Sequence, residues 1–344
     1  MVLNHHLSFQ TLLDALLDEA KPLNPRYLYR LSDLESEEIA QLERAWGRIP
    51  LWRRKALLED LEELSQTNNL LSFEAIGRYA IRDQDPQVRC LAINLLFDYE
   101  TVDLIPNFIE LVQEDEDYNV RAAAAMALGQ YVYMGEIEEL PVKTLRKIED
   151  CLLKVLASDE VAEVQRRALE SLGFSSREEV PHFIENAFRS GSREWMASAL
   201  FAMGRSFDQR WKDIVLKTLD HKVPSLREEA ARAAGELELR EAVPLLIELL
   251  EDSEDDVRDA AIWSLSQIGG EGVREILERL LDEAQEDDEI SFLENALDNL
   301  SFTDDLQPFS LFEFDQEDLE PRIHHSLWED DEDFLDIEDD DEDS

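Results

Sequence analysis

Apolar residues recur along the chain at the spacing of an amphipathic helix, and this pattern itself returns at a fixed interval. Six ungapped ten-residue segments share it, and their first residues lie 32, 44, 31, 31 and 31 positions apart. The segments are 88–97, 120–129, 164–173, 195–204, 226–235 and 257–266. A period held at 31 residues predicts a repeat architecture, with one insertion near 131–144 inside the longest interval.

A second helical segment follows four of the copies, at 104–113, 179–188, 242–251 and 272–281. Three of these segments have a proline near their start, where a helix needs no amide donor. Where a copy of the first segment ends in glycine, the helix is predicted to end at that residue. A helix often ends at a residue in the left-handed conformation, and glycine adopts this conformation at the lowest energetic cost. These glycines are Gly129, Gly173, Gly204 and Gly235.

Each unit is therefore expected to be two antiparallel helices joined by short loops. Such a pair cannot bury its apolar face alone, so neighbouring units must stack. Small residues such as Ala122 to Ala125 and Ala230 in the first segments would let the stacked helices approach closely. The predicted fold class is all-α, a right-handed α-solenoid of stacked antiparallel helix pairs.

The unit has a polar cap, then Val-Arg or Leu-Arg, then an Ala-rich helix ending in Leu-Gly or Ala-Gly, and a Val/Ile-Pro step at the next helix. This pattern resembles the short HEAT-like repeats first recognised in phycobilisome bilin lyases. The resemblance is clear from 85 to about 285 and weaker over 49–82. It divides the chain into a helical cap (1–48), a HEAT-like solenoid (49–300) and a C-terminal tail (301–344).

An arginine recurs at the start of the repeated segment, as Arg89, Arg121, Arg227 and Arg258. Capping carboxylates such as Asp85 and Asp256 lie beside it in sequence, and the next repeat is expected to supply another. Bidentate pairing between a guanidinium and a carboxylate of the neighbouring repeat would fix the twist between them. This structural role is favoured over a ladder of ligand-binding guanidinium groups.

The chain carries a formal charge of −48. This sign repels a phosphate backbone, so no nucleic-acid binding is expected, and it favours a protein partner with a basic surface. No stretch approaches the length and apolar character of a membrane span, and Cys90 and Cys151 do not have the spacing of a disulfide framework. A cytoplasmic location and no membrane association are predicted.

The tail holds nineteen Asp and Glu residues against Arg322, and it is predicted to be disordered. Apolar residues stand among these acids, and two explanations remain open. The tail is either a solvated end or a segment that folds on a partner through aromatic anchors, for which the candidates are Phe309, Phe312, Phe314, Trp328 and Phe334. A further hypothesis is that the tail docks on the chain's own basic clusters, for which the candidates are Arg53, Arg54, Lys55, Lys143 and Lys147.

No catalytic motif, metal-ligand spacing or cofactor signature is present in the sequence. Deoxyhypusine hydroxylase also has HEAT-like repeats, and a resemblance to it would imply a di-iron site built from paired His-Glu dipeptides. No histidine in this sequence is followed by Glu, so the sequence does not match that site. A non-enzymatic protein-binding scaffold is therefore predicted, without cofactor or metal. Its concave face is expected to be lined by the Ala-rich helices, with Glu170, Glu229 and Asp259 exposed. The alternatives are a bilin-lyase-like protein that handles a chromophore and an acidic chaperone or mimic that shields a basic client.

Overall fold

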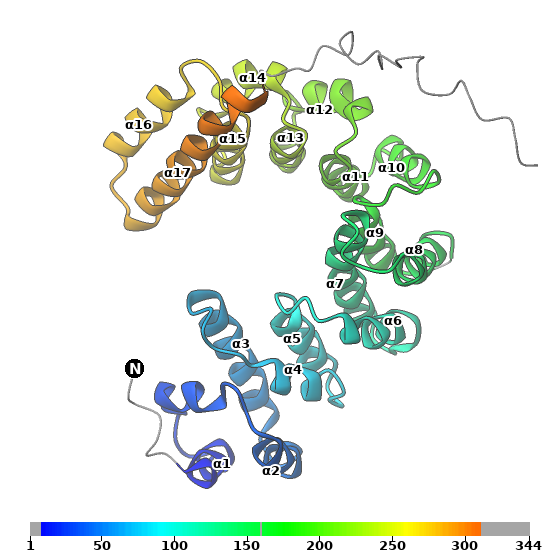
Figure 1. The fold of residues 1–344 in the computed structure, drawn as a ribbon, viewed down its shortest axis with the longest axis vertical. Helices are drawn as coiled ribbons and strands as arrows, with labels where there is room; N and C mark the ends of the chain where they lie inside the picture. The colour runs from blue at the N-terminus through cyan, green and yellow to red at the C-terminus, as the bar shows by residue number, and fades with distance from the viewer. Residues whose placement is uncertain (1–7, 159, 311–344) are drawn as a thin grey trace, which may run out of the picture. The chain divides into compact units, whose positions relative to one another are not determined.

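The computed structural model of the chain describes residues 8–158 and 160–310, and every regular element in these ranges is a helix (Figure 1). By the contacts between Cα atoms the chain divides into two units, 1–303 and 304–344, and the repeats all belong to the first. The elements of the N-terminal part are α1 (Phe9–Leu17), η1 (Pro25–Leu31), α2 (Ser36–Trp46) and α3 (Leu51–Thr67).

Seven helix pairs follow. They are α4 (Glu74–Ala80) with α5 (Pro86–Leu96), α6 (Ile105–Glu114) with α7 (Tyr118–Glu136), α8 (Val142–Leu156) with α9 (Ala162–Leu172), α10 (Val180–Arg189) with α11 (Arg193–Arg205), α12 (Lys212–Thr218) with α13 (Pro224–Glu236), α14 (Val243–Leu249) with α15 (Asp255–Ile268), and α16 (Val273–Glu283) with α17 (Asp287–Ser310). Short 3-10 turns precede three of the outer helices: η2 (Val102–Leu104), η3 (Gln209–Trp211) and η4 (Arg240–Ala242).

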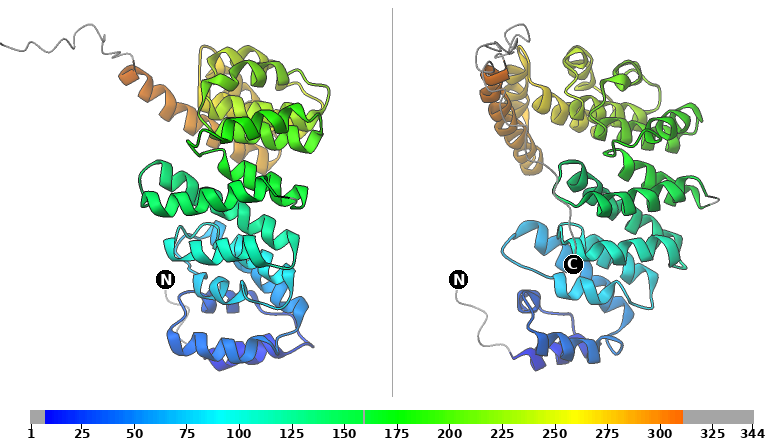
Figure 2. Two further views of the ribbon diagram at one scale, coloured as in Figure 1. Left: turned by 90° about the vertical axis from the view of Figure 1, so that its right-hand side faces the viewer. Right: turned by 45° about the vertical axis from the view of Figure 1, so that its right-hand side comes forward.

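Within the first unit the helices form two rows, which Figures 1 and 2 show from three sides. The odd-numbered helices from α5 to α15 form the inner row, and each packs against the next helix of that row. The even-numbered helices from α6 to α14 form the outer row, and each packs against the inner helix of its own pair. This arrangement confirms the predicted all-α solenoid of stacked antiparallel pairs.

The repeated glycines have a different role from the predicted one. Gly129, Gly204 and Gly235 lie inside helices, and Gly173 follows α9 with a φ of −50°, so none of the four is left-handed. A Cβ at Gly173 or Gly204 would lie 3.0 Å from the Cα of an alanine in the next inner helix. The prediction that these glycines end the helices in a left-handed conformation is therefore wrong, although Gly173 does follow the last residue of α9. They are required because the inner helices pack backbone against backbone.

Side-chain hydrogen bonds reinforce this close packing. The hydroxyl of Ser264, buried in α15, donates to the carbonyl of Ala231 in α13 at 2.6 Å. In the same way Ser171 in α9 donates to the carbonyl of Ala125 in α7 at 2.8 Å. Both serines lie opposite a glycine of the neighbouring helix, so each hydrogen bond holds two inner helices together at the point where their backbones come closest.

The C-terminal helix extends further than the repeat pattern indicated. The helix α17 continues to Ser310, so the first ten residues of the predicted disordered tail, 301–310, are helical. No glycine interrupts 287–310, and the sequence argument had placed the boundary only where the repeats stop. Phe309 falls in the last turn of α17, whereas Phe312, Phe314, Trp328 and Phe334 lie outside the described residues. No helix among the described residues is long and apolar enough to cross a membrane.

Candidate binding groove

The recurring arginines form bidentate ion pairs between successive repeats. At the start of α5, Arg89 donates from Nε and Nη2 to the two carboxylate oxygens of Asp115, at 2.8 and 2.7 Å. The other two complete pairs are Arg121 with Glu160, at 2.8 Å twice, and Arg227 with Asp252, at 2.7 Å twice. We call these three pairs the arginine ladder. Each guanidinium also donates to a backbone carbonyl six residues before it, in the loop that precedes its helix.

The electrostatics of the arginine ladder indicate a structural role. Its side chains are mostly buried, and hydrogen bonds from Arg227 hold the pKa of Asp252 below its usual value. Arg121 lowers the pKa of Glu160 by the same means. Both carboxylates are therefore charged at neutral pH and fully engaged. A ligand would have to displace a bidentate pair to reach either guanidinium.

The remaining residues predicted for the ladder do not take part in its bidentate pairs. They are Arg258, Asp85 and Asp256. Arg258 donates to the carbonyl of Asp252 at 2.7 Å and pairs with Asp255, within its own helix. Asp85 accepts hydrogen bonds from the first amides of α5 and pairs with Lys55 at 3.2 Å, and it does not pair with Arg89. Asp256 is exposed and has no ion pair within the described residues. The sequence placed these carboxylates beside the arginine, but a helix-capping side chain turns toward the amides that it caps.

The first of the two basic clusters predicted to dock the tail is already used inside the fold. Arg53 is only 2% exposed, and it donates to the carbonyls of Asp18 and Lys21 at 2.6 and 2.7 Å. Arg54 pairs with buried Asp83, and Lys55 is held by Asp85 and Gln87. Arg53 therefore offers no surface to a peptide. Lys143 and Lys147, by contrast, are exposed on α8.

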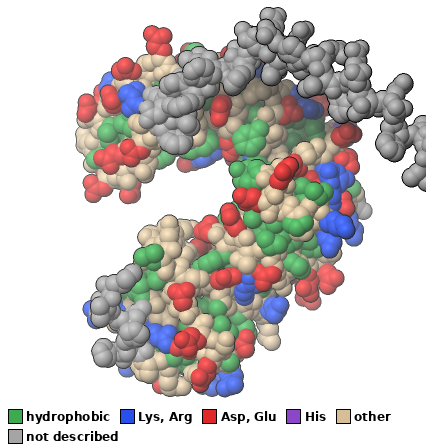
Figure 3. All heavy atoms as spheres, viewed as in Figure 1, with side chains coloured by type: hydrophobic (Ala, Val, Ile, Leu, Met, Phe, Trp, Pro, Cys, Tyr) green, Lys and Arg blue, Asp and Glu red, His purple; other side chains and the backbone are tan. Residues whose placement is uncertain are grey.

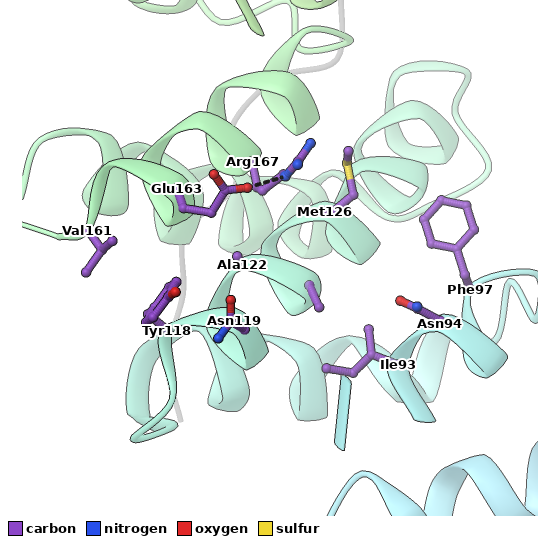
Figure 4. A pocket seen from close by; sticks show the side chains of 11 residues that line it. Ile93, Asn94, Phe97, Tyr118, Asn119, Ala122, Met126, Val161, Glu163 and Arg167 are labelled. Carbon is purple, nitrogen blue, oxygen red and sulfur yellow. Dashed lines mark hydrogen bonds and ion pairs between the residues drawn. The ribbon is translucent and has the colours of Figure 1, made fainter. Parts of the chain in front are cut away.

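A groove with a cavity volume of about 690 Å³ crosses three consecutive inner helices, α5, α7 and α9 (Figure 4). Its most exposed apolar side chains are Phe97 (38%), Tyr118 (44%) and Val161 (45%), one from each helix or its end. We call this feature the inner groove. Its lining residues are Ile93, Asn94, Phe97, Tyr118, Asn119, Ala122, Ala123, Met126, Val161, Glu163 and Arg167.

The local sequence explains the shape of the inner groove. Ala122 and Ala123 are small, so the middle of α7 leaves room between its neighbours. Ile93 and Met126 add apolar surface, and a methionine side chain adapts readily to the shape of what it contacts. Hydrophobic side chains gather on the face of the molecule that Figure 3 shows, with acidic side chains among them. The inner groove is thus an apolar surface within a strongly acidic chain.

One ion pair closes an edge of the inner groove. The Nε of Arg167 donates to Glu163 at 3.0 Å (Figure 4), and a second nitrogen of Arg167 donates to Glu170 at 2.8 Å. Glu170 was expected on the exposed concave face, but it is buried and also accepts a hydrogen bond from Ser198 at 2.6 Å. That expectation is wrong because α9 and α11 pack so closely that the Glu170 carboxylate lies between them. Asp259, the third expected acid, is exposed.

Another inner-row carboxylate has an unusual environment. Glu229 on α13 is half-buried, and burial raises its pKa to about 7, with repulsion from Glu228, Glu170 and Glu236 acting in the same direction. Its Oε2 atom is buried and has no hydrogen-bond partner among the described residues. Near neutral pH this carboxyl is therefore partly protonated.

The sequence did not identify the inner groove. All three exposed apolar residues lie at helix ends, where Phe97 is the last residue of the first repeated segment and Tyr118 and Val161 precede the next two segments. A usable signal was present, because Val161 takes an N-cap position, which Ser, Thr, Asp and Asn strongly prefer. No group of three or more His, Cys, Asp or Glu side chains in the described ranges is arranged to hold a metal ion. The chemistry of the inner groove is that of apolar contact bordered by amides and one ion pair.

Comparison with known protein families identifies HEAT repeats in two parts of the chain. The family model for HEAT repeats matches residues 74–148 and 213–297. Similar solved structures include the YibA protein of E. coli (16% identity, 83% of this chain and 99% of that one, TM-score 0.41). Others are the CpcE–CpcF complex of phycocyanin lyase from a Nostoc species (20%, 66% and 94%, 0.45) and human deoxyhypusine hydroxylase (17%, 86% and 96%, 0.35).

No protein of curated function matches the sequence. The family match falls on the stacked helix pairs α4 to α7 and α12 to α16, which include the ladder pairs Arg89–Asp115 and Arg227–Asp252. On this evidence the chain carries HEAT repeats over residues 74–148 and 213–297.

Proposed function

We propose that this HEAT-repeat protein is a non-enzymatic scaffold that binds a segment of another protein in the inner groove. The observation that carries the proposal is the exposure of Phe97, Tyr118 and Val161 around one cavity on three successive inner helices. Burial of clustered aromatic and aliphatic side chains is the main source of binding energy in protein interfaces. A solenoid presents such clusters along an extended surface without any catalytic apparatus.

The size and lining of the inner groove favour a peptide segment as the ligand. A volume of about 690 Å³ lies within the range of sites that enclose a few side chains. The Asn94 and Asn119 amides at its border can satisfy the backbone groups of an incoming segment. The net charge of −48 favours a partner whose surface around that segment is basic, since opposite charge accelerates encounter.

The tail is proposed as a second binding element. Residues 301–344 carry a formal charge of −18 with aromatic side chains among the acids, a composition that suits either docking on a partner or occupation of the chain's own binding surface. A full chain and a chain ending at Ser310 separate these two roles. Docking predicts weaker partner binding after truncation, whereas autoinhibition predicts tighter binding.

Site-specific photo-crosslinking in the native host tests the proposal for the inner groove. A photoreactive residue at Asn119, which is exposed within the groove, is expected to couple to a defined protein. The matched control carries the same group at Leu70, which is 76% exposed but distant in sequence and not part of the groove lining. An identical set of products from the two positions, or none from either, would contradict the proposal.

A further inference from the structure

The outer helix α8 carries a stripe of exposed lysines in this otherwise acidic chain. Lys143, Lys147 and Lys154 are exposed, and their spacing of four and seven residues places them on one face of the helix. The first and the last are eleven positions apart, which corresponds to about 16 Å along the helix axis. None of the three forms an ion pair with a described residue. We call this feature the α8 lysine stripe.

The acidic residues of α8 do not cancel the charge of the stripe. Asp150 lies on the same face, but the Nη1 of Arg177 donates to its carboxylate at 3.0 Å. Glu149 points into the core, where it is fully buried and receives a hydrogen bond from Arg146 at 2.8 Å. The helix has four basic and two acidic residues, a formal charge of +2. Figure 3 shows basic side chains gathered at this level of the outer row.

Apolar surface adjoins the stripe at its N-terminal end. Val142 is the first residue of α8 and is 68% exposed, and Ile137 in the preceding loop is also exposed. A basic face that contacted only solvent would not require the exposed aliphatic side chains of Val142 and Ile137 beside it. Lysines beside exposed aliphatic groups suit a ligand that combines carboxylates with apolar anchors.

The charge of the whole chain limits the class of ligand. Its −48 repels long polyanions such as nucleic acids and anionic membranes. A short peptide on the stripe experiences mainly the local field, because salt screens charges beyond about 8 Å at physiological ionic strength. We propose that the α8 lysine stripe is a docking site for an acidic peptide with apolar side chains among its carboxylates. The stripe lies on the outer row, so this site is independent of the inner groove.

A peptide of the sequence 326–344 of this chain is a suitable probe, since it has twelve carboxylates together with Trp328, Phe334 and three aliphatic residues. Its binding to the full chain can be measured by fluorescence anisotropy at low salt. The triple variant K143Q/K147Q/K154Q is expected to weaken binding about tenfold or more, at the usual strength of exposed ion pairs. The matched control K217Q/K222Q/R240Q removes three exposed cations elsewhere and is expected to leave binding unchanged.

A second measurement keeps the test decisive if the chain's own tail competes with the probe. Zero-length carbodiimide coupling is expected to join Lys143, Lys147 or Lys154 to a carboxylate of the sequence 326–344. That carboxylate can belong to the added peptide or to the chain's own tail, and an isotope label on the peptide distinguishes the two. The coupling should disappear at about 1 M salt, where the screening length falls to about 3 Å. Coupling no greater than that of Lys217 and Lys222 would overturn the proposal. So would an oligonucleotide of equal charge that binds the stripe more tightly than the peptide.

Discussion

The arginine ladder makes a quantitative prediction at Asp252. The substitution Asp252→Asn removes the negative charge that Arg227 contacts through two hydrogen bonds of 2.7 Å. The Arg227 and Asp252 side chains are 14% and 8% exposed, so neither group can be fully rehydrated in place. Breaking a buried pair costs about 3–5 kcal/mol, and partial exposure here reduces the expected loss to about 2–3 kcal/mol.

The assay should resolve the repeat that carries the pair. Because each unit of a solenoid contacts only its neighbours, unfolding need not be two-state, and a single global free energy can mislead. Hydrogen exchange of the α13 and α15 amides reports the local free energy of opening directly. The expected result is faster exchange in these two helices and little change in α5 and α7.

The pH dependence provides an independent check. Since Arg227 holds the folded-state pKa of Asp252 below its usual value of 3.8, the carboxylate contributes stability above that value. This contribution is lost as the pH falls through the lowered folded-state pKa. The difference between wild type and Asp252→Asn should therefore be full at pH 7 and shrink under strongly acidic conditions.

The same substitution three residues later is the matched control. Asp255 is 84% exposed and pairs with Arg258 within one helix, so Asp255→Asn is expected to cost less than about 1 kcal/mol. Equal costs for Asp252→Asn and Asp255→Asn would refute the inter-repeat role of the arginine ladder. A loss at Asp252 that did not change with pH would refute its electrostatic origin.

Two further predictions concern the inner row. Gly204→Ala should destabilise the chain by about 1–3 kcal/mol through overpacking, because the added Cβ would lie 3.0 Å from the Cα of Ala233. Gly47→Ala, where nothing lies within 4 Å and φ is −66°, should be neutral or stabilising in the same thermal unfolding assay, and the reverse order would contradict the packing argument. Glu229→Gln should remove a loss of stability that the wild type shows as the pH rises through about 7, the raised folded-state pKa of Glu229. Parallel pH profiles of the two proteins would show that Glu229 is not held protonated by burial.

The fold could be predicted from the sequence because it depends on a period. Apolar spacing identified the helices, and the 31-residue interval identified the stacking. The recurring arginine was assigned to pairing between repeats, but its partners were not, because Asp115, Glu160 and Asp252 lie in loops that the alignment did not cover. A periodic pattern locates a side chain on its own helix and leaves the partner undefined.

The glycines and the basic cluster show where sequence reasoning failed. Glycine at a helix end and glycine at a close helix contact look alike in one sequence. They are distinguished only by the structure, in which a Cβ at Gly204 would lie 3.0 Å from the Cα of Ala233. Arg53 appeared to be a surface cation, but its guanidinium lies over the Trp52 ring at 4.6 Å and donates to the backbone carbonyls of Asp18 and Lys21. The inner groove was missed for a related reason, since it is formed by residues brought together from three repeats.

The affinity of the crosslinked partner for a groove variant tests the central proposal most directly. Tyr118→Ala together with Val161→Ala removes apolar side chains that are already partly exposed, so the fold should be retained. Loss of two interface anchors of this kind is expected to raise the dissociation constant by about tenfold or more, while Leu70→Ala leaves it unchanged. An unchanged dissociation constant for the double variant, measured on protein with wild-type thermal stability, would contradict binding in the inner groove.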